Sequence, residues 1–478
     1  MNVLIAVHHF LPRYHGGAEW RAYRTARELA RRGQQIHLLT VESIGEDRDE
    51  SEEHTKYDGL DVQRLYYDLA TAPEPFRWSY RNPIVSRAAR RLIDRFEPDV
   101  LHLIGGYMMS GSVVEVAREA RVPVVLTLTD FWFMCPRITM VTADGQLCDY
   151  PDTPHECALC LLAQQRRYRW PARLAPKAWR WGQALLQQID ERLQLTAVSR
   201  MNALIRERRQ YLRQILDEVD IVISPSQFLQ RFFAERGYCV EQSRFIRQGL
   251  EINHWANAEW EADDRHLRIG YIGQIAPHKG VDLLCDAFRR LRANHRHPTL
   301  TLYGDTGKHP QFVRQVTREV DGHVDITFAG TFPNHQIKTI HAGLDVLVVP
   351  STWYENSPTV ILEAFGAGTP VIASNLGGMA ELVKHNENGL LFEPGNVDDL
   401  TAQLQRILDD DALLAELRAG IPRVKTIEEE VDELLAIYGA VQRSPLLPDA
   451  VQKQGSVVTL PGALSPARGS GKGSGARL

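Results

Sequence analysis

The sequence has few cysteines, no long apolar run and little net charge, and each of these shortages excludes a class of protein. Six cysteines among 478 residues do not indicate a disulfide scaffold, so a reducing cytoplasm is expected. No apolar run approaches the ~20 residues of a membrane-spanning helix. Met1 leads directly into an apolar run without a basic region or a cleavage site, which predicts a buried strand and no signal peptide. The net charge of −5 provides no general attraction to nucleic acid.

A dinucleotide-binding signature is also missing. That fold places G-x-G-x-x-G after its first strand, where this sequence has HHFLPRYHGGAEW, and the absence weakens an oxidoreductase interpretation. Gly16 and Gly17 instead give a bare backbone before a helix that begins near Glu19, and such a turn lets a phosphate or sugar come close. An ordinary strand-to-helix turn explains the same glycines.

Short apolar runs alternate with helical patterns in both halves of the chain, which predicts two doubly wound α/β domains. The runs are continuous, as in parallel strands that are buried on both faces. The predicted strands are 3–7, 36–40, 100–105, 122–130 and 221–226 in the first half, and 268–273, 300–304, 326–330, 346–351, 370–374 and 389–394 in the second.

Composition predicts the boundaries between these parts. A first domain would cover 1–246, a polar linker 247–267, a second domain 268–425, a final helix 426–443 and a disordered tail 444–478 that is rich in Gly, Ser and Pro. Inside the first domain we expect a cysteine-containing insertion at 131–165 and a basic helical segment at 164–213.

The stretch PSTWYENSPTVILEAFGAGTPVIAS, residues 350–374, predicts a helix that is suited to an anion. Ser357 is a good N-cap, and Pro358 is favoured at the first helical position. A helix that begins here would direct the unpaired N–H groups of Thr359 and Val360 outward, where they attract negative charge.

Two carboxylates flank this helix start, and a lysine lies in a comparable turn of the same half. Carboxylates accept hydrogen bonds from sugar hydroxyls, which would suit Glu355 and Glu363. Lys279 precedes another helix beside Gly280 and suits a phosphate. Together these residues predict a site for a nucleotide sugar, although each alone is explained as a solvated side chain or as a complement to a helix dipole.

The ordered set GGAE (16–19), PDVLHL (98–103), GQIAPHKGVDLL (273–284) and the E-x7-E run resembles the family 4 glycosyltransferases. The likeness extends from the start of the chain to about residue 443. It implies the GT-B fold, which consists of two Rossmann-like domains with the ligand cleft between them. It also implies transfer with retention, no catalytic metal, and a final helix that crosses back onto the first domain.

The resemblance implies a role for each matched residue. Glu355 would contact the donor sugar, Glu363 the ribose and Lys279 the diphosphate, while Gly16 and Gly17 would lie beside the departing phosphate. Gln274 stands where the family often has an arginine that contacts the diphosphate.

A second departure lies after the fourth strand, where the family often has His-Asp and this chain has Thr129-Asp130. Asp130 would orient the acceptor or act as a weak base, or it simply begins the following turn.

We therefore predict a retaining enzyme that moves a sugar from a UDP- or GDP-type donor to a hydroxyl of a glycan or lipid-linked acceptor. The expected setting is polysaccharide or lipopolysaccharide assembly in the cytoplasm, on or near the inner face of the cytoplasmic membrane. A nucleotide-sugar epimerase of related fold and a catalytically idle sugar-binding module are the alternatives. Release of nucleotide in the presence of acceptor would favour transfer.

The basic helical segment supports the membrane part of this hypothesis. Twelve Arg or Lys stand against three acids between Arg166 and Arg213, a net charge of +9. Trp170, Trp179 and Trp181 interleave with them, as in surfaces that meet anionic lipid. The alternative is a helical insertion that packs its tryptophans inward.

Four cysteines in the insertion form C-x12-C-x8-C-x2-C: Cys135, Cys148, Cys157 and Cys160. Four thiols with one CxxC can hold a structural zinc, and free thiols in an irregular insertion are the alternative.

Metal analysis separates these two interpretations of the cysteines. If the thiols hold zinc, the purified protein will carry about one equivalent, and Cys157→Ser will release it and lower the melting temperature. Metal-free protein whose stability the substitution leaves unchanged would contradict zinc binding.

Overall fold

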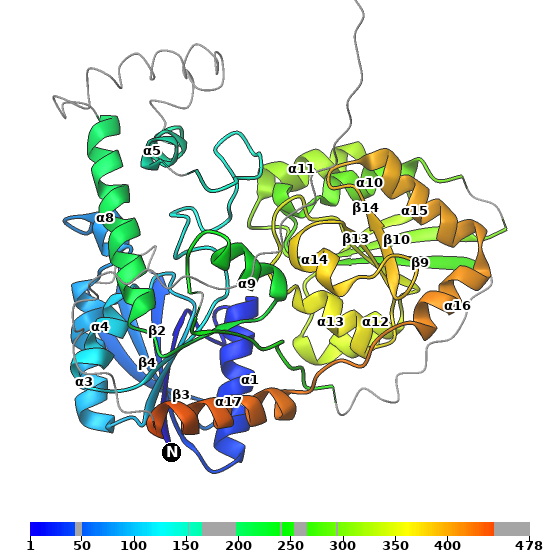
Figure 1. Cartoon of the computed structure of the whole chain (residues 1–478). Coiled ribbons are helices and arrows are strands. Elements are labelled where there is room, and N and C mark those ends of the chain that lie inside the picture. Colours follow the sequence, from blue (N-terminus) through cyan, green and yellow to red (C-terminus); the bar gives the residue numbers. More distant parts are fainter. Residues whose placement is uncertain are drawn as a thin grey trace, which may run out of the picture. The chain divides into compact units, whose positions relative to one another are not determined.

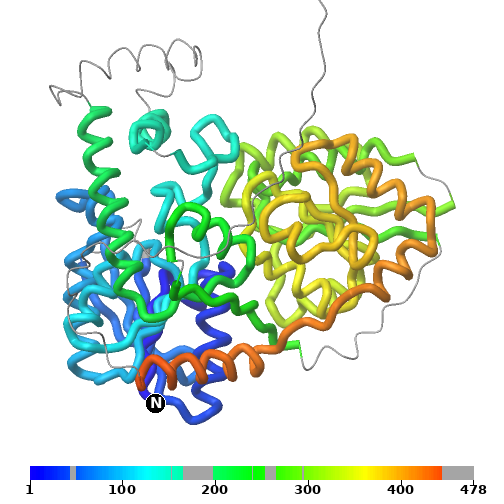
Figure 2. Tube along the Cα trace, viewed as in Figure 1, coloured from blue at the N-terminus to red at the C-terminus, as the bar shows by residue number. Residues whose placement is uncertain are grey.

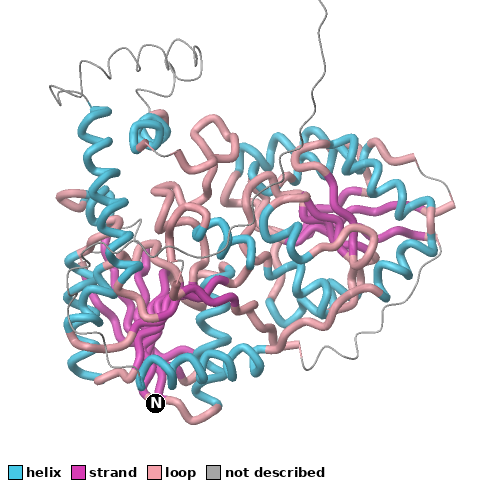
Figure 3. Tube along the Cα trace, in the orientation of Figure 1, coloured by secondary structure: helices cyan, strands magenta, loops and turns pink. Residues whose placement is uncertain are grey.

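The computed structural model describes residues 1–43, 50–151, 153–164, 197–239, 241–252, 265–292 and 295–443, which fold into two parallel-sheet α/β domains (Figure 1). The predicted tail at 444–478 lies outside these residues, as does most of the basic segment and of the linker. Helices flank both sheets (Figure 3).

The first sheet has eight strands in the order β3-β4-β2-β1-β5-β6-β7-β8. All neighbours pair in parallel except β3 and β4. The strands are β1 Asn2–His8, β2 Gln35–Ser43, β3 Ser51–Tyr57, β4 Leu60–Tyr67, β5 Val100–Ile104, β6 Val124–Thr127, β7 Ile221–Ser224 and β8 Ser243–Phe245.

The sequence patterns miss the strands at the edges of this sheet. β3 is largely exposed and β4 alternates, so neither shows the continuous apolar run of a central strand, and β8 has only three residues. The signal that could have found β3 and β4 is the Asp58-Gly59 pair between them. Both residues have positive φ, 48° and 79°, as a two-residue hairpin turn requires.

The helices of the first domain are α1 Gly17–Arg31, α2 Pro75–Trp78, α3 Pro83–Phe96, α4 Ser112–Glu119, α5 Pro154–Leu162, α8 Ala197–Asp217 and α9 Gln227–Ala234, with a 3-10 turn, η1, at Leu69–Thr71. The predicted helix before the second strand is confirmed. Gly33, with φ 79°, lies just beyond its last turn.

The second sheet is parallel throughout, with six strands in the order β11-β10-β9-β12-β13-β14. All six were predicted: β9 His266–Ile272, β10 His297–Tyr303, β11 Ile326–Gly330, β12 Val346–Val349, β13 Val371–Ser374 and β14 Gly389–Phe392. Its helices are α10 Val281–Arg289, α11 Pro310–Glu319, α12 Ile337–Ala342, α13 Thr359–Gly366, α14 Gly377–Leu382, α15 Val397–Asp409 and α16 Asp411–Ala419, with 3-10 turns η2 at Pro277–Lys279 and η3 at Asn334–Gln336.

Strand order fixes where ligands can collect in each sheet. In a doubly wound sheet they bind outside the carboxyl ends of the strands, at the point where the order reverses. In the first sheet the order reverses around β1 and β5, and in the second around β9 and β12. The Gly16-Gly17 turn follows β1, the Lys279 turn follows β9 and Glu355 follows β12, so topology alone brings these motifs to the two switch points.

The last described helix, α17 (Ile427–Arg443), packs against α1 of the first domain (Figure 2). Its apolar face enters the core beneath β1, and its Tyr438 hydroxyl is 2.6 Å from Nδ1 of the buried His102. Glu430 of this helix is fully buried, where it accepts hydrogen bonds from Arg21 at 2.5 Å and from the backbone N–H of Gly249 at 2.7 Å. The helix α17 thus completes the core of the first domain.

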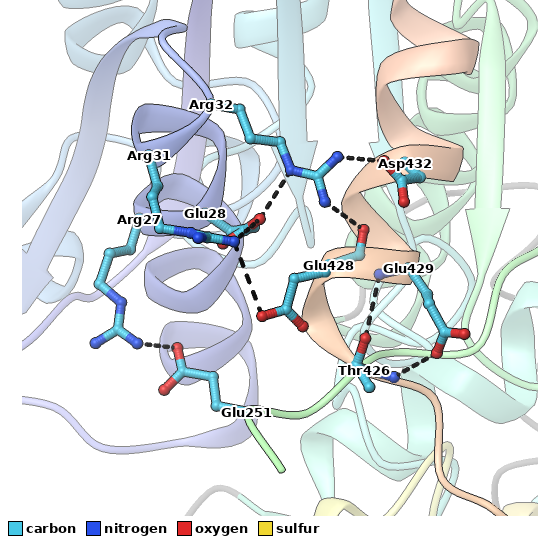
Figure 4. A network of polar contacts seen from close by, with 9 residues as sticks. All are labelled: Arg27, Glu28, Arg31, Arg32, Glu251, Thr426, Glu428, Glu429 and Asp432. Atoms are coloured by element: carbon cyan, nitrogen blue, oxygen red, sulfur yellow. Dashed lines mark hydrogen bonds and ion pairs between the residues drawn. The ribbon is translucent and has the colours of Figure 1, made fainter. Parts of the chain in front are cut away.

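An outer layer of ion pairs borders the same contact (Figure 4). Arg32 of α1 reaches Asp432 and the backbone oxygen of Glu428 on α17, and Arg27 pairs with Glu251 at 2.5 Å. Among the described helices, none is long and apolar enough to cross a bilayer.

Candidate active site

The turn after β9 depends on Gly280, whose lack of a side chain lets two loops meet. Its φ is +69°, and a Cβ built there would lie 2.1 Å from the backbone oxygen of Pro350, at the end of β12. Both the positive φ and the close approach exclude other residues. Lys279 is thereby held against the loop that carries Glu355.

Glu355 accepts three hydrogen bonds on one carboxylate oxygen. Oε1 lies 2.6 Å from the Lys279 ammonium, 2.8 Å from the Ser351 hydroxyl and 2.7 Å from the Trp353 indole nitrogen. Burial by itself would raise the pKa of Glu355, but Lys279 and these hydrogen bonds lower it below its ordinary value. The carboxylate is therefore ionised at neutral pH. Its Oε2 receives no hydrogen bond from the described residues.

The predicted N-cap of α13 is wrong by one residue. The helix begins at Thr359 with Pro358 in the capping position, and no side chain caps it. The Ser357 hydroxyl instead is buried without a hydrogen-bond partner in the described part of the chain. The first N–H groups of a helix, here those of Thr359 and Val360, have no partner within it, so the predicted anion-binding end is present without a capping side chain.

Glu363 lies one turn into α13 and meets the first domain. Arg24 of α1 approaches it at 3.4 Å, and both side chains are almost completely buried. Burial raises the pKa of Glu363, and Arg24 only partly offsets this effect. In this structure the carboxylate predicted for the ribose is thus paired with an arginine.

The glycine turn after β1 faces the start of α13. Gly16 is the N-cap of α1 in an extended conformation, and a Cβ on Gly17 would lie 3.9 Å from the Thr359 hydroxyl. Neither glycine has the positive φ that other residues avoid, so their backbone geometry alone does not require glycine. Gln248 also reaches this helix start, because its side-chain amide donates to Thr359 Oγ1 at 2.9 Å and to Ser357 O at 3.2 Å.

Asp130 lies three residues beyond the end of β6 and not at the end of the strand itself. It accepts hydrogen bonds from Trp132 N at 2.8 Å and from Thr129 Oγ1 at 3.1 Å, so it does begin the following turn. Burial raises the pKa of Asp130 to about 6. The carboxyl can therefore also serve as a hydrogen-bond acceptor at neutral pH.

Sequence reasoning missed His8, which ends β1. Its Nδ1 is buried with no hydrogen-bond partner among the described residues, and burial lowers its pKa to about 3, which keeps the ring neutral. Its ring meets that of Tyr107, beyond β5, edge-on at 5.5 Å. The pair His8-His9, which precedes the Gly16-Gly17 turn in the sequence, could have drawn attention to it.

Gln274 follows β9 and is exposed. Its backbone oxygen accepts a hydrogen bond from the Tyr271 hydroxyl at 2.6 Å, and its side chain contacts no described residue through a hydrogen bond. Its predicted contact with the diphosphate stays a prediction.

The four cysteines of the insertion do not form a metal cage in this structure. Arg209 donates to the Cys157 sulfur at 3.3 Å and Arg137 to the Cys160 sulfur at 3.4 Å, while Cys135 and Cys148 pack against the apolar core. Within the described ranges, no group of three or more His, Cys, Asp or Glu is placed to hold a metal. Zinc binding by these thiols stays a prediction.

The structure also corrects part of the basic segment. Arg208 is 1% exposed; it donates to the backbone oxygen of Trp132 and lies over its ring. Arg209 lies over the Tyr150 ring. Arg208 is therefore buried within the fold and Arg209 is half-buried, whereas Arg166, Arg167, Arg169 and the three tryptophans lie outside the described residues.

Two models of glycosyltransferase families match the chain. Residues 256–422 match the family Glycosyl transferases group 1, and residues 16–150 match the Glycosyl transferase 4-like domain. Together with two parallel-sheet domains whose motifs meet at the switch points, these matches indicate a glycosyltransferase of the GT-B fold and the family 4 type.

Relatives of known name are similar over part of their length. The 2-deoxystreptamine glucosyltransferase of Streptomyces kanamyceticus is 37% identical over 154 residues, which is 32% of this chain and 39% of that protein. The lipopolysaccharide 1,2-N-acetylglucosaminetransferase of Salmonella typhimurium is 30% identical over 214 residues, 40% of this chain and 53% of the relative. The chain thus spans about half of these relatives or less.

Solved structures show the same fold over nearly the whole chain. Sucrose-phosphate synthase from Thermosynechococcus elongatus superposes with a TM-score of 0.63 at 18% identity, covering 92% of this chain and 98% of that one. HepE of Anabaena, in complex with UDP and glucose, gives a TM-score of 0.60 at 16% identity, covering 92% and 100%.

The Lys279–Glu355 pair yields a prediction about nucleotide binding. Lys279→Ala removes the cation beside the α13 N-terminus, so nucleoside diphosphate affinity should fall about tenfold or more, as for a lost charge-assisted hydrogen bond. Affinity for the free nucleoside should stay within about twofold. Calorimetric titration measures both, and Lys384→Ala, at a lysine whose side chain is 65% exposed, is the control. Equal losses for nucleotide and nucleoside would show that Lys279 does not recognise phosphate.

Proposed function

We propose that this protein is a retaining glycosyltransferase that moves a sugar from a nucleotide diphosphate donor to a hydroxyl acceptor. One observation carries the proposal: the ionised Glu355, held by Lys279 on one oxygen, lies in the loop that leads to the uncapped start of α13. A cation and unpaired N–H groups suit a diphosphate, and a carboxylate with a second oxygen available suits sugar hydroxyls.

The donor would be held mainly by the second domain. Its diphosphate would lie at the N–H groups of Thr359 and Val360 with Lys279 beside it, and the glycine turn of the first domain would approach from the other side. Glu355 would hold the transferred sugar, and Glu363 would hold the ribose after exchanging Arg24 for hydroxyl groups. Gln274 is the remaining candidate for a diphosphate contact.

Catalysis would rest on stabilising the charge that develops on the departing diphosphate and on positioning the two reactants. The oxygen of the acceptor hydroxyl would bond to the anomeric carbon on the face from which the diphosphate leaves, as retention requires, and its proton would pass to the departing phosphate oxygen. Asp130 would accept a hydrogen bond from that hydroxyl. We assign no pair of carboxylates as nucleophile and acid, and no step to a metal.

The comparisons support the substrate classes without deciding between them. The structure of HepE contains UDP and glucose, and the Salmonella relative is a lipopolysaccharide transferase. We infer a UDP- or GDP-sugar donor and a glycan or lipid-linked acceptor, in the assembly of cell-surface polysaccharide or lipopolysaccharide at the cytoplasmic side of the membrane. Transfer to an added acceptor distinguishes this function from epimerisation and from binding without turnover.

Glu355 provides the direct test of the function. Mass-spectrometric screening of nucleotide sugars for binding and slow hydrolysis identifies the donor, and Glu355→Gln then removes the charge while it keeps the shape. Transfer should fall at least ~100-fold, the scale of a lost transition-state contact, with folding intact. Glu387→Gln, at a carboxylate that is 57% exposed on the same domain, is the matched control. Near-normal turnover by the Glu355→Gln variant would remove Glu355 from the mechanism.

Membrane attachment is a separate part of the proposal, which the charge of the basic segment supports. Each basic residue near an anionic surface is worth about 1 kcal/mol, so a few that face one way suffice for reversible binding. The protein should co-sediment with anionic vesicles at low salt, release at high salt, and lose binding when Arg166, Arg167 and Arg169 become Gln. Failure to bind at low salt would leave the lipid-linked acceptor without physical support.

A further inference from the structure

Residues of the first domain hold both neighbours of Glu355 in the chain. On one side, the Tyr354 ring packs against the first-domain core, with ring centroids 5.4 Å from Phe228, 5.6 Å from Phe232 and 6.0 Å from Phe131. These partners belong to α9 and to the turn that Asp130 begins. A residue of the second domain thus completes an aromatic cluster of the first.

On the other side, Asn356 uses both ends of its side-chain amide on the first domain. Its Oδ1 accepts from the Ser226 hydroxyl at 2.7 Å, and its Nδ2 donates to the backbone oxygen of Thr129 at 3.2 Å. Ser226 is the N-cap of α9, and Thr129 directly precedes Asp130. The residue that follows the donor carboxylate is therefore hydrogen-bonded beside the predicted acceptor residue.

The backbone of the same loop rests on the start of α14. Gly378 N donates to Glu355 O at 2.7 Å, and a Cβ on Gly378 would lie 1.8 Å from Asn356 O, so no other residue fits there. Glu381 of α14 in turn accepts from Phe228 N at 2.7 Å and Gln227 N at 3.1 Å, the first N–H groups of α9. The loop and α9 are thus joined through two separate sets of contacts.

Glu355 consequently has two kinds of support. Its side chain is held by Lys279, Ser351 and Trp353 of the second domain, while its backbone position is set by neighbours that the first domain holds. We propose that Tyr354 and Asn356 are positioning residues, through which docking of the first domain places the donor-sugar carboxylate for transfer. The same contacts tie this carboxylate to the turn that Asp130 begins, so donor and acceptor sites would be aligned by one set of bonds.

This inference rests on the proposed function for its activity readout, and it predicts a split between binding and turnover. The Asn356 side chain bonds to Ser226 and Thr129 and makes no described hydrogen bond to Lys279 or to the first N–H groups of α13. Loss of a hydrogen bond between Asn356 and the first domain should therefore leave nucleoside diphosphate affinity within about twofold. It should lower kcat about 10- to 100-fold, the scale for a misplaced reacting group.

The sharpest variant is Asn356→Asp, which keeps the acceptor for Ser226 but replaces the donor to Thr129 O by a repelling oxygen. Asn386→Asp is the matched control, since Asn386 is exposed on the same domain and its Oδ1 accepts from Arg406. Tyr354→Leu, which removes the ring, should lower kcat to a similar extent. Tyr354→Phe, which retains the ring, should keep kcat near the wild-type value.

Hydrogen exchange provides a readout that does not require activity. In Asn356→Asp, amide exchange should accelerate together at 354–357 and at 129–132, because the lost hydrogen bond from Asn356 Nδ2 to Thr129 O joins these two segments. A wild-type protein that turns over no nucleotide sugar would end the proposed function while this exchange result still stands. The positioning role is overturned if kcat is unchanged, if nucleotide affinity falls in parallel with kcat, or if exchange changes on one side only.

Discussion

The ion pair between Lys279 and Glu355 is the interaction on which the candidate site depends, because it joins the loops after β9 and β12 across the switch point of the second sheet. The two loops come this close because residue 280 is a glycine. A Cβ at this position would lie 2.1 Å from the backbone oxygen of Pro350 and would collide with it. A carboxylate so far removed from water would otherwise protonate. With the ammonium and two further donors on one oxygen, it stays charged and leaves its other oxygen available.

The pKa values of three carboxyls near the candidate site shift in different directions because their partners differ. Lys279 supplies a full charge at 2.6 Å and lowers the pKa of Glu355. Arg24 approaches Glu363 only to 3.4 Å, so burial prevails and raises its pKa. Asp130 has a backbone N–H and a hydroxyl, and the charge of Arg208 only partly offsets burial, which raises its pKa to about 6. The candidate site thus brings together carboxyls whose pKa values are shifted differently by their surroundings.

The first domain is completed from the far end of the chain. Glu430 of α17 is buried between Arg21 and the backbone of Gly249, and a buried charge without these partners would be strongly destabilising. The bonds of α17 with α1, and those of Asn356 with Ser226 and Thr129, connect the two domains at separate places. The position of Glu355 therefore depends on contacts that extend well beyond its own loop.

Sequence by itself predicted the two α/β domains, since short continuous apolar runs such as that of β12 require burial on both faces, and it predicted which turns carry the candidate site residues. It did not reveal the hairpin β3–β4, whose first strand is an exposed edge strand, or the true start of α13. Only the tertiary structure decided that Cys157 and Cys160 accept hydrogen bonds from arginines and that Arg208 is buried. It also decided that Tyr354 and Asn356 pack on the first domain. Asn356 and its partner Thr129 are 227 positions apart, and no local pattern records a partner at that distance.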